Sequence, residues 1–175
     1  MIDAQPAFAL DDMQGTPASF PSGKPAVVCF LKEDCPTCNE VMGILDAFYE
    51  AYGDSVDILL AGQTADGNRT LIDRHSLSVP LLDDSSLKVA WAWEIDIVPT
   101  IYLTNGDGAP LERREGFVRD EWLTLDATIA NQAGTDAAPI KWEELPAWRP
   151  GCGSLTGDPE IAARLAAESE NSPIR

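Results

Sequence analysis

Two cysteines separated by two residues, Cys35 and Cys38, are the side chains of this sequence whose types and spacing most directly indicate chemistry. They follow an apolar run, Ala26–Leu31, which predicts a buried strand. They precede a segment with one apolar helical face, which we expect to end near Tyr52. The pair therefore lies where a strand passes into a helix, and a C-x-x-C motif at such a junction is typical of a redox dithiol.

The beginning of the helix gives the two thiols different chemistry. Cys35 is predicted at the helix N-terminus, where unpaired N–H groups and the helix dipole favour a thiolate. Pro36 suits the first turn because the N–H that it lacks would be unpaired there anyway. Cys38 lies one turn further on and can close a disulfide with Cys35. We expect Cys35 to be the exposed attacking thiol and Cys38 to be the shielded thiol that resolves a mixed disulfide.

Neighbouring residues act on the pKa of Cys35 in both directions. Glu33 and Asp34 bring negative charge and oppose the thiolate, while Lys32 offsets part of this effect. The Thr37 hydroxyl is a further hydrogen-bond donor for the sulfur. The sequence predicts a lowered Cys35 pKa without fixing how far it falls.

Two further residues have reactive side chains but are predicted to be inert. Cys29 lies within the apolar run before the motif, so we expect a core thiol without a redox role. His75, the one histidine, lies in a predicted helix and is interpreted as a surface residue rather than a ligand.

Cys152 lies between two glycines near the C-terminal end of the chain. Glycines permit a tight turn or a close approach of two backbones. A functional third redox thiol and a free surface thiol are equally open interpretations. If it is functional, its expected partner is Cys38 or Cys35, with the buried Cys29 less favoured.

The remaining patterns predict alternating strands and helices. Strands are expected over 56–61, 79–82 and 97–103, helices over 69–77, 87–93 and about 122–134, a polar loop over 62–68, and hairpins over 8–20 and 97–117. Asp83-Asp84-Ser85 is expected to cap the helix that follows it. This order predicts an α/β fold, with a sheet covered by helices on both faces.

The last part of the chain changes character after Gly134. It is rich in proline and glycine, and one helix is predicted over 159–168. Trp142 and Trp148 indicate that this segment packs against the domain. We therefore divide the chain into a domain over 1–134 and a C-terminal extension over 135–175 that packs on it.

The composition excludes several classes of protein. The chain has 12 basic and 29 acidic residues, a net charge of −17, which should repel nucleic acid and anionic membranes. No apolar stretch reaches the length of a membrane span. The segment 1–6 has neither a basic region nor an apolar core, so it does not read as a signal peptide. From this we expect a cytoplasmic protein.

The motifs together resemble the thioredoxin superfamily, in its redoxin branch, over roughly residues 5–134. The resemblance rests on Cys35-Pro36-Thr37-Cys38 at the strand-to-helix turn, on Ile97-Val98-Pro99-Thr100, and on the Asn105–Gly108 hairpin turn after it. The segment 148–154 also resembles redoxin-like proteins that end in P-G-C-G-S. The resemblance implies a thioredoxin fold, with a central mixed sheet flanked by helices, an N-terminal β-hairpin and a C-terminal extension.

By this resemblance Cys35 is the attacking thiol, Cys38 is the resolving thiol, and Pro99 is a cis-proline beside them, with Pro36, Thr37 and Thr100 in supporting positions. In that family the backbone before the cis-proline is free to pair with an extended substrate segment.

Three departures from the family pattern bear on the mechanism. Asp34 stands where many relatives carry an aromatic residue. Cys29 stands where thioredoxins carry a buried carboxylate that takes the proton of the resolving thiol, which leaves Glu33 or water as the proton route. Peroxiredoxins carry a threonine or serine three residues before the peroxide-reacting cysteine, where Cys35 has Lys32.

The sequence therefore predicts a thiol–disulfide oxidoreductase that needs no cofactor or metal. Its partners would be a disulfide-containing protein or small molecule and an external thiol reductant. One alternative is a thiol peroxidase in which Cys35 meets peroxide and Cys38 or Cys152 resolves. Another is a non-enzymatic metal-binding protein that uses Cys35, Cys38 and Cys152 as thiolates. The oligomeric state is left open.

Overall fold

The computed structural model describes residues 3–171 of the chain. The outer ends of the predicted division into 1–134 and 135–175, and the first two residues of the segment 1–6, lie outside the described residues. No helix in the described part is long and apolar enough to cross a membrane.

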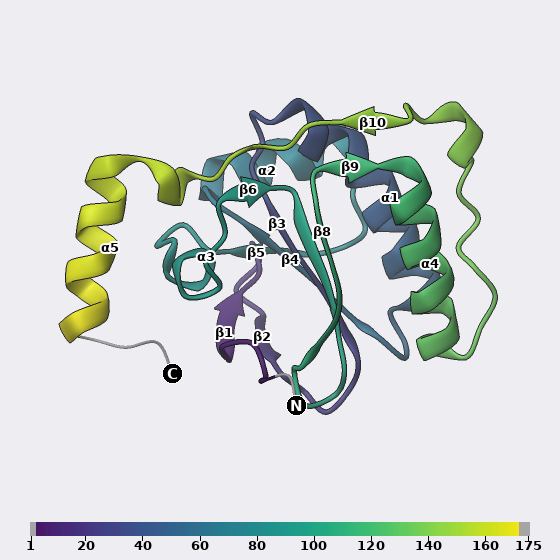
Figure 1. The fold of residues 1–175 in the computed structure, drawn as a ribbon, viewed down its shortest axis with the longest axis horizontal. Helices are drawn as coiled ribbons and strands as arrows, with labels where there is room; N and C mark the ends of the chain where they lie inside the picture. Colours follow the sequence, from purple (N-terminus) through teal and green to yellow (C-terminus); the bar gives the residue numbers. More distant parts are fainter. Residues whose placement is uncertain (1–2, 172–175) are drawn as a thin grey trace.

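A five-stranded mixed sheet forms the centre of the molecule (Figure 1). Its strands, in spatial order, are β5 (Leu81–Asp83), β4 (Asp57–Gly62), β3 (Ala26–Leu31), β7 (Thr100–Thr104) and β8 (Pro110–Glu115). The first three run parallel to one another, whereas β7 is antiparallel to both β3 and β8. All six residues of β3 are buried, as its unbroken apolar sequence predicts for a central strand.

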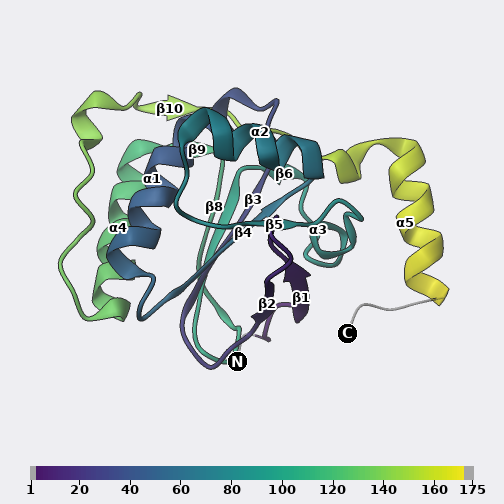
Figure 2. The same cartoon turned by 180° about the vertical axis from the view of Figure 1, so that it is seen from behind.

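The helices connect and cover this sheet. They are α1 (Pro36–Tyr52), α2 (Ala65–His75), α3 (Lys88–Ala92), α4 (Arg119–Ala133) and α5 (Pro159–Asn171). Helices α1 and α4 lie side by side, and α5 lies at the opposite end of the molecule from them (Figures 1 and 2). This is the predicted α/β thioredoxin-like fold.

The predicted N-terminal hairpin is present as β1 (Phe8–Asp11) and β2 (Pro17–Phe20). Phe8 and Phe20 stack on each other, and Trp93 meets both rings with centroid distances of 6.0 and 5.2 Å. The Trp93 indole also donates a hydrogen bond to the carbonyl oxygen of Pro6 at 2.9 Å. Trp93 is thus a core aromatic that fixes the hairpin against the domain.

The segment predicted as a polar loop over 62–68 is largely helical, which corrects that expectation. Helix α2 begins at Ala65 because the side chain of Thr64 accepts the N–H of Gly67 at 3.0 Å and caps the helix. Gly67 and Asn68, two residue types common in loops, lie in this helix and make tertiary contacts. A side chain at Gly67 would collide with Glu33, and the Asn68 amide donates to the carbonyl oxygen of Leu82 at 2.9 Å.

Other predicted elements are found with shifted ends. Asp84 caps α3 as expected, accepting the N–H groups of Val89 and Ala90 at 3.2 and 2.9 Å. The strand predicted over 97–103 is divided at Pro99 into β6 (Ile97–Val98), which lies outside the main sheet, and β7. Strand β7 pairs antiparallel with β8, so the second predicted hairpin is also found, and β9 (Phe117–Val118) follows β8 outside the main sheet.

The C-terminal extension runs across the molecule from α4 to α5, along the end of the sheet where α1 begins (Figures 1 and 2). It contains η1 (Trp142–Glu144), β10 (Trp148–Arg149), β11 (Cys152–Gly153) and η2 (Leu155–Gly157). Strand β10 pairs with β9, and β11 pairs with β6, both antiparallel. Backbone pairing to the domain, rather than a tryptophan anchor alone, therefore holds this segment.

The two tryptophans of the extension have different surroundings. Trp142 packs against the hydrophobic core. Trp148 is 62% exposed, so the expectation that its side chain docks the extension is wrong. Only its backbone takes part, through the pairing with Val118.

Replacement of Trp122 by alanine should destabilise the protein far more than the same change at Trp148. Trp122 is fully buried against Phe117 and donates its indole N–H to the carbonyl oxygen of Gly116 at 3.1 Å. We expect Trp122→Ala to lower the free energy of unfolding by about 3–5 kcal/mol. Trp148→Ala should stay within about 0.5 kcal/mol of the wild type. Urea unfolding measures both, and equal losses would contradict this placement.

Candidate active site

Cys35 occupies the N-cap position of α1, directly after β3. Its backbone is extended, with φ −93° and ψ 115°, and Pro36 is the first helical residue. The N–H of Cys38 donates to the Cys35 sulfur at 3.3 Å, and the N–H of Thr37 also hydrogen-bonds to it. The predicted position of the dithiol at the beginning of a helix is thus found.

These contacts lower the pKa of Cys35 to about 5. The largest cause is a hydrogen bond from the Cys38 side chain. Burial opposes it, and hydrogen bonds from the Cys152 side chain and from the N–H groups of Cys38 and Thr37 add to it. Cys35 is therefore predominantly a thiolate at neutral pH, in the direction that the sequence predicts.

Cys38 has the opposite character. Burial raises its pKa well above the ordinary value, and its hydrogen bond and charge interaction with Cys35 raise it further. It stays protonated and donates to Cys35. The two thiols of the motif are thus differentiated as acceptor and donor.

The loop before β7 lies against the Cys35 sulfur. The Val98–Pro99 peptide bond is cis, as predicted, and the carbonyl oxygen of Val98 lies 3.6 Å from the Cys35 sulfur. Thr100 is fully buried and donates its hydroxyl to the carbonyl oxygen of Ile97 at 2.6 Å. Thr100 thus fixes the turn that carries Pro99.

Cys35 is not exposed, which corrects the expectation of an accessible nucleophile. Its relative exposure is 0%, and the C-terminal extension lies over it. Cys152 in β11 is the backbone partner of Val98, and its thiol hydrogen-bonds to the Cys35 sulfur. Cys152 itself is only partly buried.

Two neighbours of the motif act differently from the expectation. The Thr37 hydroxyl donates to the carbonyl oxygen of Pro150 in the extension, not to Cys35. The Lys32 ammonium lies 3.5 Å from the Asp34 carboxylate and donates to the carbonyl oxygen of Gly153 at 2.8 Å. Both side chains therefore hold the extension in place by hydrogen bonds to its backbone.

Cys29 is fully buried in β3, and burial raises its pKa, so it has the predicted character of a core thiol.

Glu33, considered as a proton acceptor for Cys38, has its side chain against Gly67 of α2. The sequence does not predict this, because the contact depends on where α2 begins.

His75 is part of a polar cluster beside the motif. It lies 2.8 Å from the Asn39 side-chain oxygen, which also accepts from Arg74 at 2.7 Å. Burial lowers the His75 pKa, and the charge of Arg74 lowers it further. The Asn39 amide in turn donates to the carbonyl oxygens of Glu33 and Cys35 at 2.9 Å. His75 thus supports the loop before α1 rather than facing the thiols.

Gln63 is a site residue that sequence reasoning missed. It is buried, donates to the Ser154 hydroxyl at 2.8 Å, and accepts the N–H of Leu155 at 2.9 Å. The sequence predicted only a polar loop over 62–68 and gave Gln63 no role. A long polar side chain directly after a buried strand was the available signal, but its partners are about 90 residues away in the sequence.

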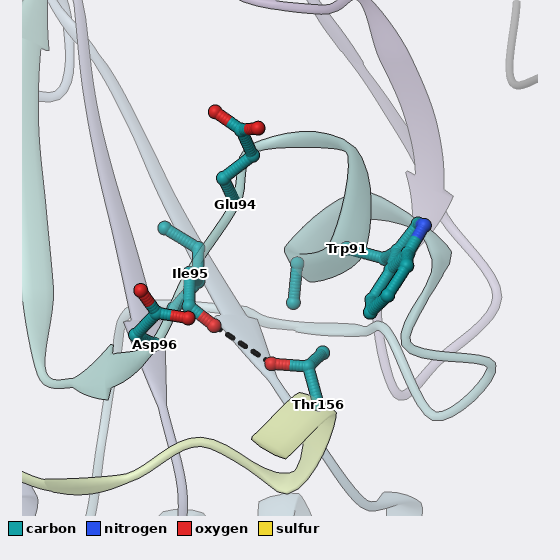
Figure 3. Close-up of a pocket in the computed structure, with 6 residues that line it drawn as sticks. Trp91, Glu94, Ile95, Asp96 and Thr156 are labelled. Atoms are coloured by element: carbon teal, nitrogen blue, oxygen red, sulfur yellow. Dashed lines mark hydrogen bonds between the residues drawn. The ribbon is translucent and has the colours of Figure 1, made fainter. Parts of the chain in front are cut away.

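The largest of the described pockets is not at the thiols. It has a volume of about 590 Å³ and lies between the α3–β6 loop and η2, lined by Ala90, Trp91, Glu94, Ile95, Asp96 and Thr156 (Figure 3). The Thr156 hydroxyl donates to the carbonyl oxygen of Ile95 at 2.7 Å across one side of it. The extension therefore forms one wall of this pocket.

Comparison with known proteins finds a family match over most of the chain. The family model described as AhpC/TSA matches residues 2–120. The chain belongs to the AhpC/TSA family. The match spans the hairpin, the dithiol, the Val98–Pro99 turn and β8, and it ends before most of α4 and before the extension.

Individual relatives of this AhpC/TSA protein are distant. One is a thiol-disulfide oxidoreductase, ResA, of Halalkalibacterium halodurans, which is 26% identical over 121 residues, or 66% of this chain and 69% of the relative. The crystal structure of StoA from Bacillus subtilis matches with a TM-score of 0.61 at 23% identity, over 70% of this chain and 96% of StoA. A secreted disulfide oxidoreductase of Mycobacterium tuberculosis, described as homologous to DsbE, matches with a TM-score of 0.60 at 19% identity, over 71% and 95%. At these identities the two structures show the shared fold.

Titration of the thiolate should show a midpoint near pH 5 for Cys35 in the reduced protein. Cys38→Ala should raise this midpoint, because the largest cause of the lowered pKa is the hydrogen bond from Cys38. Cys29→Ala should leave it unchanged, since Cys29 lies outside the set of donors to Cys35. Thiolate absorbance near 240 nm against pH measures all three proteins. A midpoint above pH 8 in the wild type would contradict this electrostatic account.

Proposed function

We propose that this AhpC/TSA protein is a thiol–disulfide oxidoreductase in which Cys35 attacks and Cys38 resolves. The observation that carries the proposal is the difference between the two thiols: the Cys35 sulfur accepts hydrogen bonds at the beginning of α1, while Cys38 is buried and protonated. The name of the relative from Halalkalibacterium halodurans supports the same reaction.

The exchange balances in two steps. The Cys35 thiolate forms a bond with one sulfur of a substrate disulfide, and the other substrate sulfur leaves as a thiolate. Cys38 then loses its proton and attacks Cys35, which releases the second substrate thiolate and leaves a Cys35–Cys38 disulfide. An external thiol reductant returns this disulfide to the dithiol.

The first step itself prepares Cys38 for the second. The charge and hydrogen bonding of Cys35 are among the causes of the raised Cys38 pKa. When Cys35 becomes part of a mixed disulfide, its negative charge is lost, and the Cys38 pKa falls. The resolving thiol is thus activated only after the attack has occurred.

The alternatives have less support. Within residues 3–171 no group of three or more His, Cys, Asp or Glu side chains is arranged to hold a metal ion, so a site made of Cys35, Cys38 and Cys152 is not proposed. A thiol peroxidase remains the second prediction from the sequence, and an assay of peroxide consumption coupled to a dithiol separates it from disulfide exchange. A cytoplasmic location stays a prediction, which cell fractionation would test.

Cys35→Ser should abolish reduction of a model disulfide such as insulin, because no other thiolate lies at the beginning of α1. Cys38→Ser should still carry out the first attack and accumulate as a mixed disulfide that mass spectrometry detects. Cys29→Ala is the matched control, and its turnover should stay near that of the wild type. Turnover retained by Cys35→Ser would contradict the assignment of the attacking thiol.

A further inference from the structure

The two thiols of the motif are covered, and the thiol that covers them is partly accessible. Cys35 and Cys38 are buried, whereas Cys152 has intermediate exposure. Cys152 hydrogen-bonds to the Cys35 sulfur from the side of the extension. With the extension in this position, a disulfide that approaches the site therefore reaches Cys152 before Cys35.

Strand β11 occupies the backbone edge that an extended substrate segment would use. Cys152 pairs with Val98 and Gly153 pairs with Ile97, antiparallel, directly before Pro99. Main-chain pairing of an added strand is a general way of binding an extended peptide. Here the chain supplies that strand itself, with a cysteine opposite the residue whose carbonyl contacts Cys35.

Specific polar contacts hold β11 in this place. The Lys32 ammonium binds the carbonyl oxygen of Gly153, and the Thr37 hydroxyl binds that of Pro150. Beyond the strand, Gln63 binds Ser154, whose N–H also donates to the carbonyl oxygen of Asp96 at 2.9 Å. Lys32 and Gln63 directly follow β3 and β4, and Thr37 lies in α1. Without the extension, the Thr37 hydroxyl and the Gln63 amide would lose these partners, whereas Lys32 would keep its ion pair with Asp34.

Glycine allows the extension to approach this closely. A Cβ atom at Gly151 would lie 2.2 Å from the Ile97 side chain and 3.0 Å from the Val98 carbonyl oxygen. Gly116, with φ +67°, lies against the same stretch, and a Cβ atom there would be 3.0 Å from the Gly151 nitrogen. A side chain at Gly151 would therefore push the segment before Cys152 away from β6.

We propose that Cys152 is a third redox thiol, which β11 holds where a substrate segment would bind. Reducing equivalents then pass between the Cys35–Cys38 pair and external thiols through a Cys35–Cys152 disulfide. This inference rests on the proposed function, which supplies the oxidised Cys35–Cys38 pair. It deepens that function by naming the sulfur through which partners reach the pair.

The relay balances without another oxidant. Cys152 loses its proton and its sulfur bonds to Cys35, the Cys35–Cys38 bond breaks, and Cys38 leaves as a thiolate and takes up a proton. An external thiol then attacks the accessible Cys152 sulfur and expels the Cys35 thiolate. A second external thiol attacks this mixed disulfide, restoring the Cys152 thiol and forming an external disulfide.

The acidities of the thiols favour the second step of this relay, in which Cys35 leaves. Cys35 has a pKa of about 5, and the thiol of lower pKa is the better leaving group in disulfide exchange. Attack on Cys152 therefore releases Cys35 readily. Burial and the hydrogen bond to Cys35 raise the pKa of Cys152 to about 11, while the charge of Lys32 lowers it. Cys152 thus stays protonated beside the Cys35 thiolate in the reduced protein, as a donor to it.

The direct test is a disulfide map of Cys38→Ser after mild oxidation with diamide. In this variant Cys35 cannot close the C-x-x-C pair, so the proposal expects a Cys35–Cys152 disulfide. Trypsin would release it as the peptide 33–69 linked to the peptide 142–164, while Cys29 falls in a third peptide, 1–32. A map in which Cys152 remains alkylatable while Cys35 is oxidised would overturn the proposal.

A matched pair of glycine variants tests whether the position of β11 against β6 is what allows the Cys35–Cys152 disulfide to form. Added to Cys38→Ser, Gly151→Ala should lower the yield of the linked peptides by about tenfold, because a disulfide requires the two Cα atoms within about 7 Å. Gly157→Ala lies on the same extension, where a Cβ atom meets nothing within 4 Å, and it should leave the yield unchanged. Equal yields in the two variants would contradict the role of this strand.

Turnover separates this inference from the function on which it rests. Cys152→Ser keeps the backbone cover over Cys35 but removes the relay sulfur, so we expect insulin reduction to fall about tenfold, a change of about 1.4 kcal/mol in activation free energy. Unchanged turnover would contradict the relay and leave the Cys35–Cys38 mechanism intact. If the wild type shows no insulin reduction while Cys38→Ser still forms the Cys35–Cys152 linked peptides, the proposed function is contradicted instead.

Discussion

The hydrogen bonds that converge on the Cys35 sulfur at the beginning of α1 are the interaction on which the site depends. The Cys35 sulfur accepts from the Cys38 thiol, which is the largest cause of its lowered pKa, and from the Cys152 thiol. A helix leaves its first N–H groups without partners inside the helix, and two of them, from Cys38 and Thr37, also point at this sulfur. Burial by itself would raise the Cys35 pKa, as it does for Cys29 in the strand just before. The difference between the two cysteines is therefore one of donors rather than of burial.

The sheet brings the Cys35 sulfur and the Val98 carbonyl group to the same place in the fold. Strand β3, buried along its whole length, delivers Cys35 to the end of the sheet, and β7 runs antiparallel beside it. The turn at Pro99 then brings the Val98 carbonyl group to the same sulfur. Pairing of neighbouring strands thus joins two motifs that are about 60 residues apart in the sequence.

The C-terminal extension gives this member of the AhpC/TSA family a covered site. The family match ends at residue 120, whereas β10, β11 and η2 all follow it. Side chains within the domain are nevertheless placed to receive the extension, among them Lys32, Thr37 and Gln63. The domain and the extension are therefore matched to each other at the thiols, which is why the chemistry of the pair cannot be considered without Cys152.

The amino-acid sequence by itself determined the order of the elements, the place of the dithiol and the direction of the Cys35 pKa. These features depend on local patterns: an apolar run for β3, one apolar face for α1, and a cysteine at a helix N-terminus. Local patterns failed where long-range contacts decide. The segment 62–68 was predicted as a polar loop, yet α2 begins within it, at Ala65, where Thr64 caps the helix. Gly67 leaves room there for the Glu33 side chain, and Asn68 donates to the Leu82 carbonyl oxygen.

Only the tertiary structure decided which thiols meet and which are accessible. The sequence left Cys152 open between a redox thiol and a surface thiol, and it predicted an exposed Cys35. In the structure Cys35 is buried, and the Cys152 thiol hydrogen-bonds to the Cys35 sulfur. The physical reason is that β11 finds its hydrogen-bond partners on β6, more than 50 residues earlier, and no periodicity within either segment specifies that pairing.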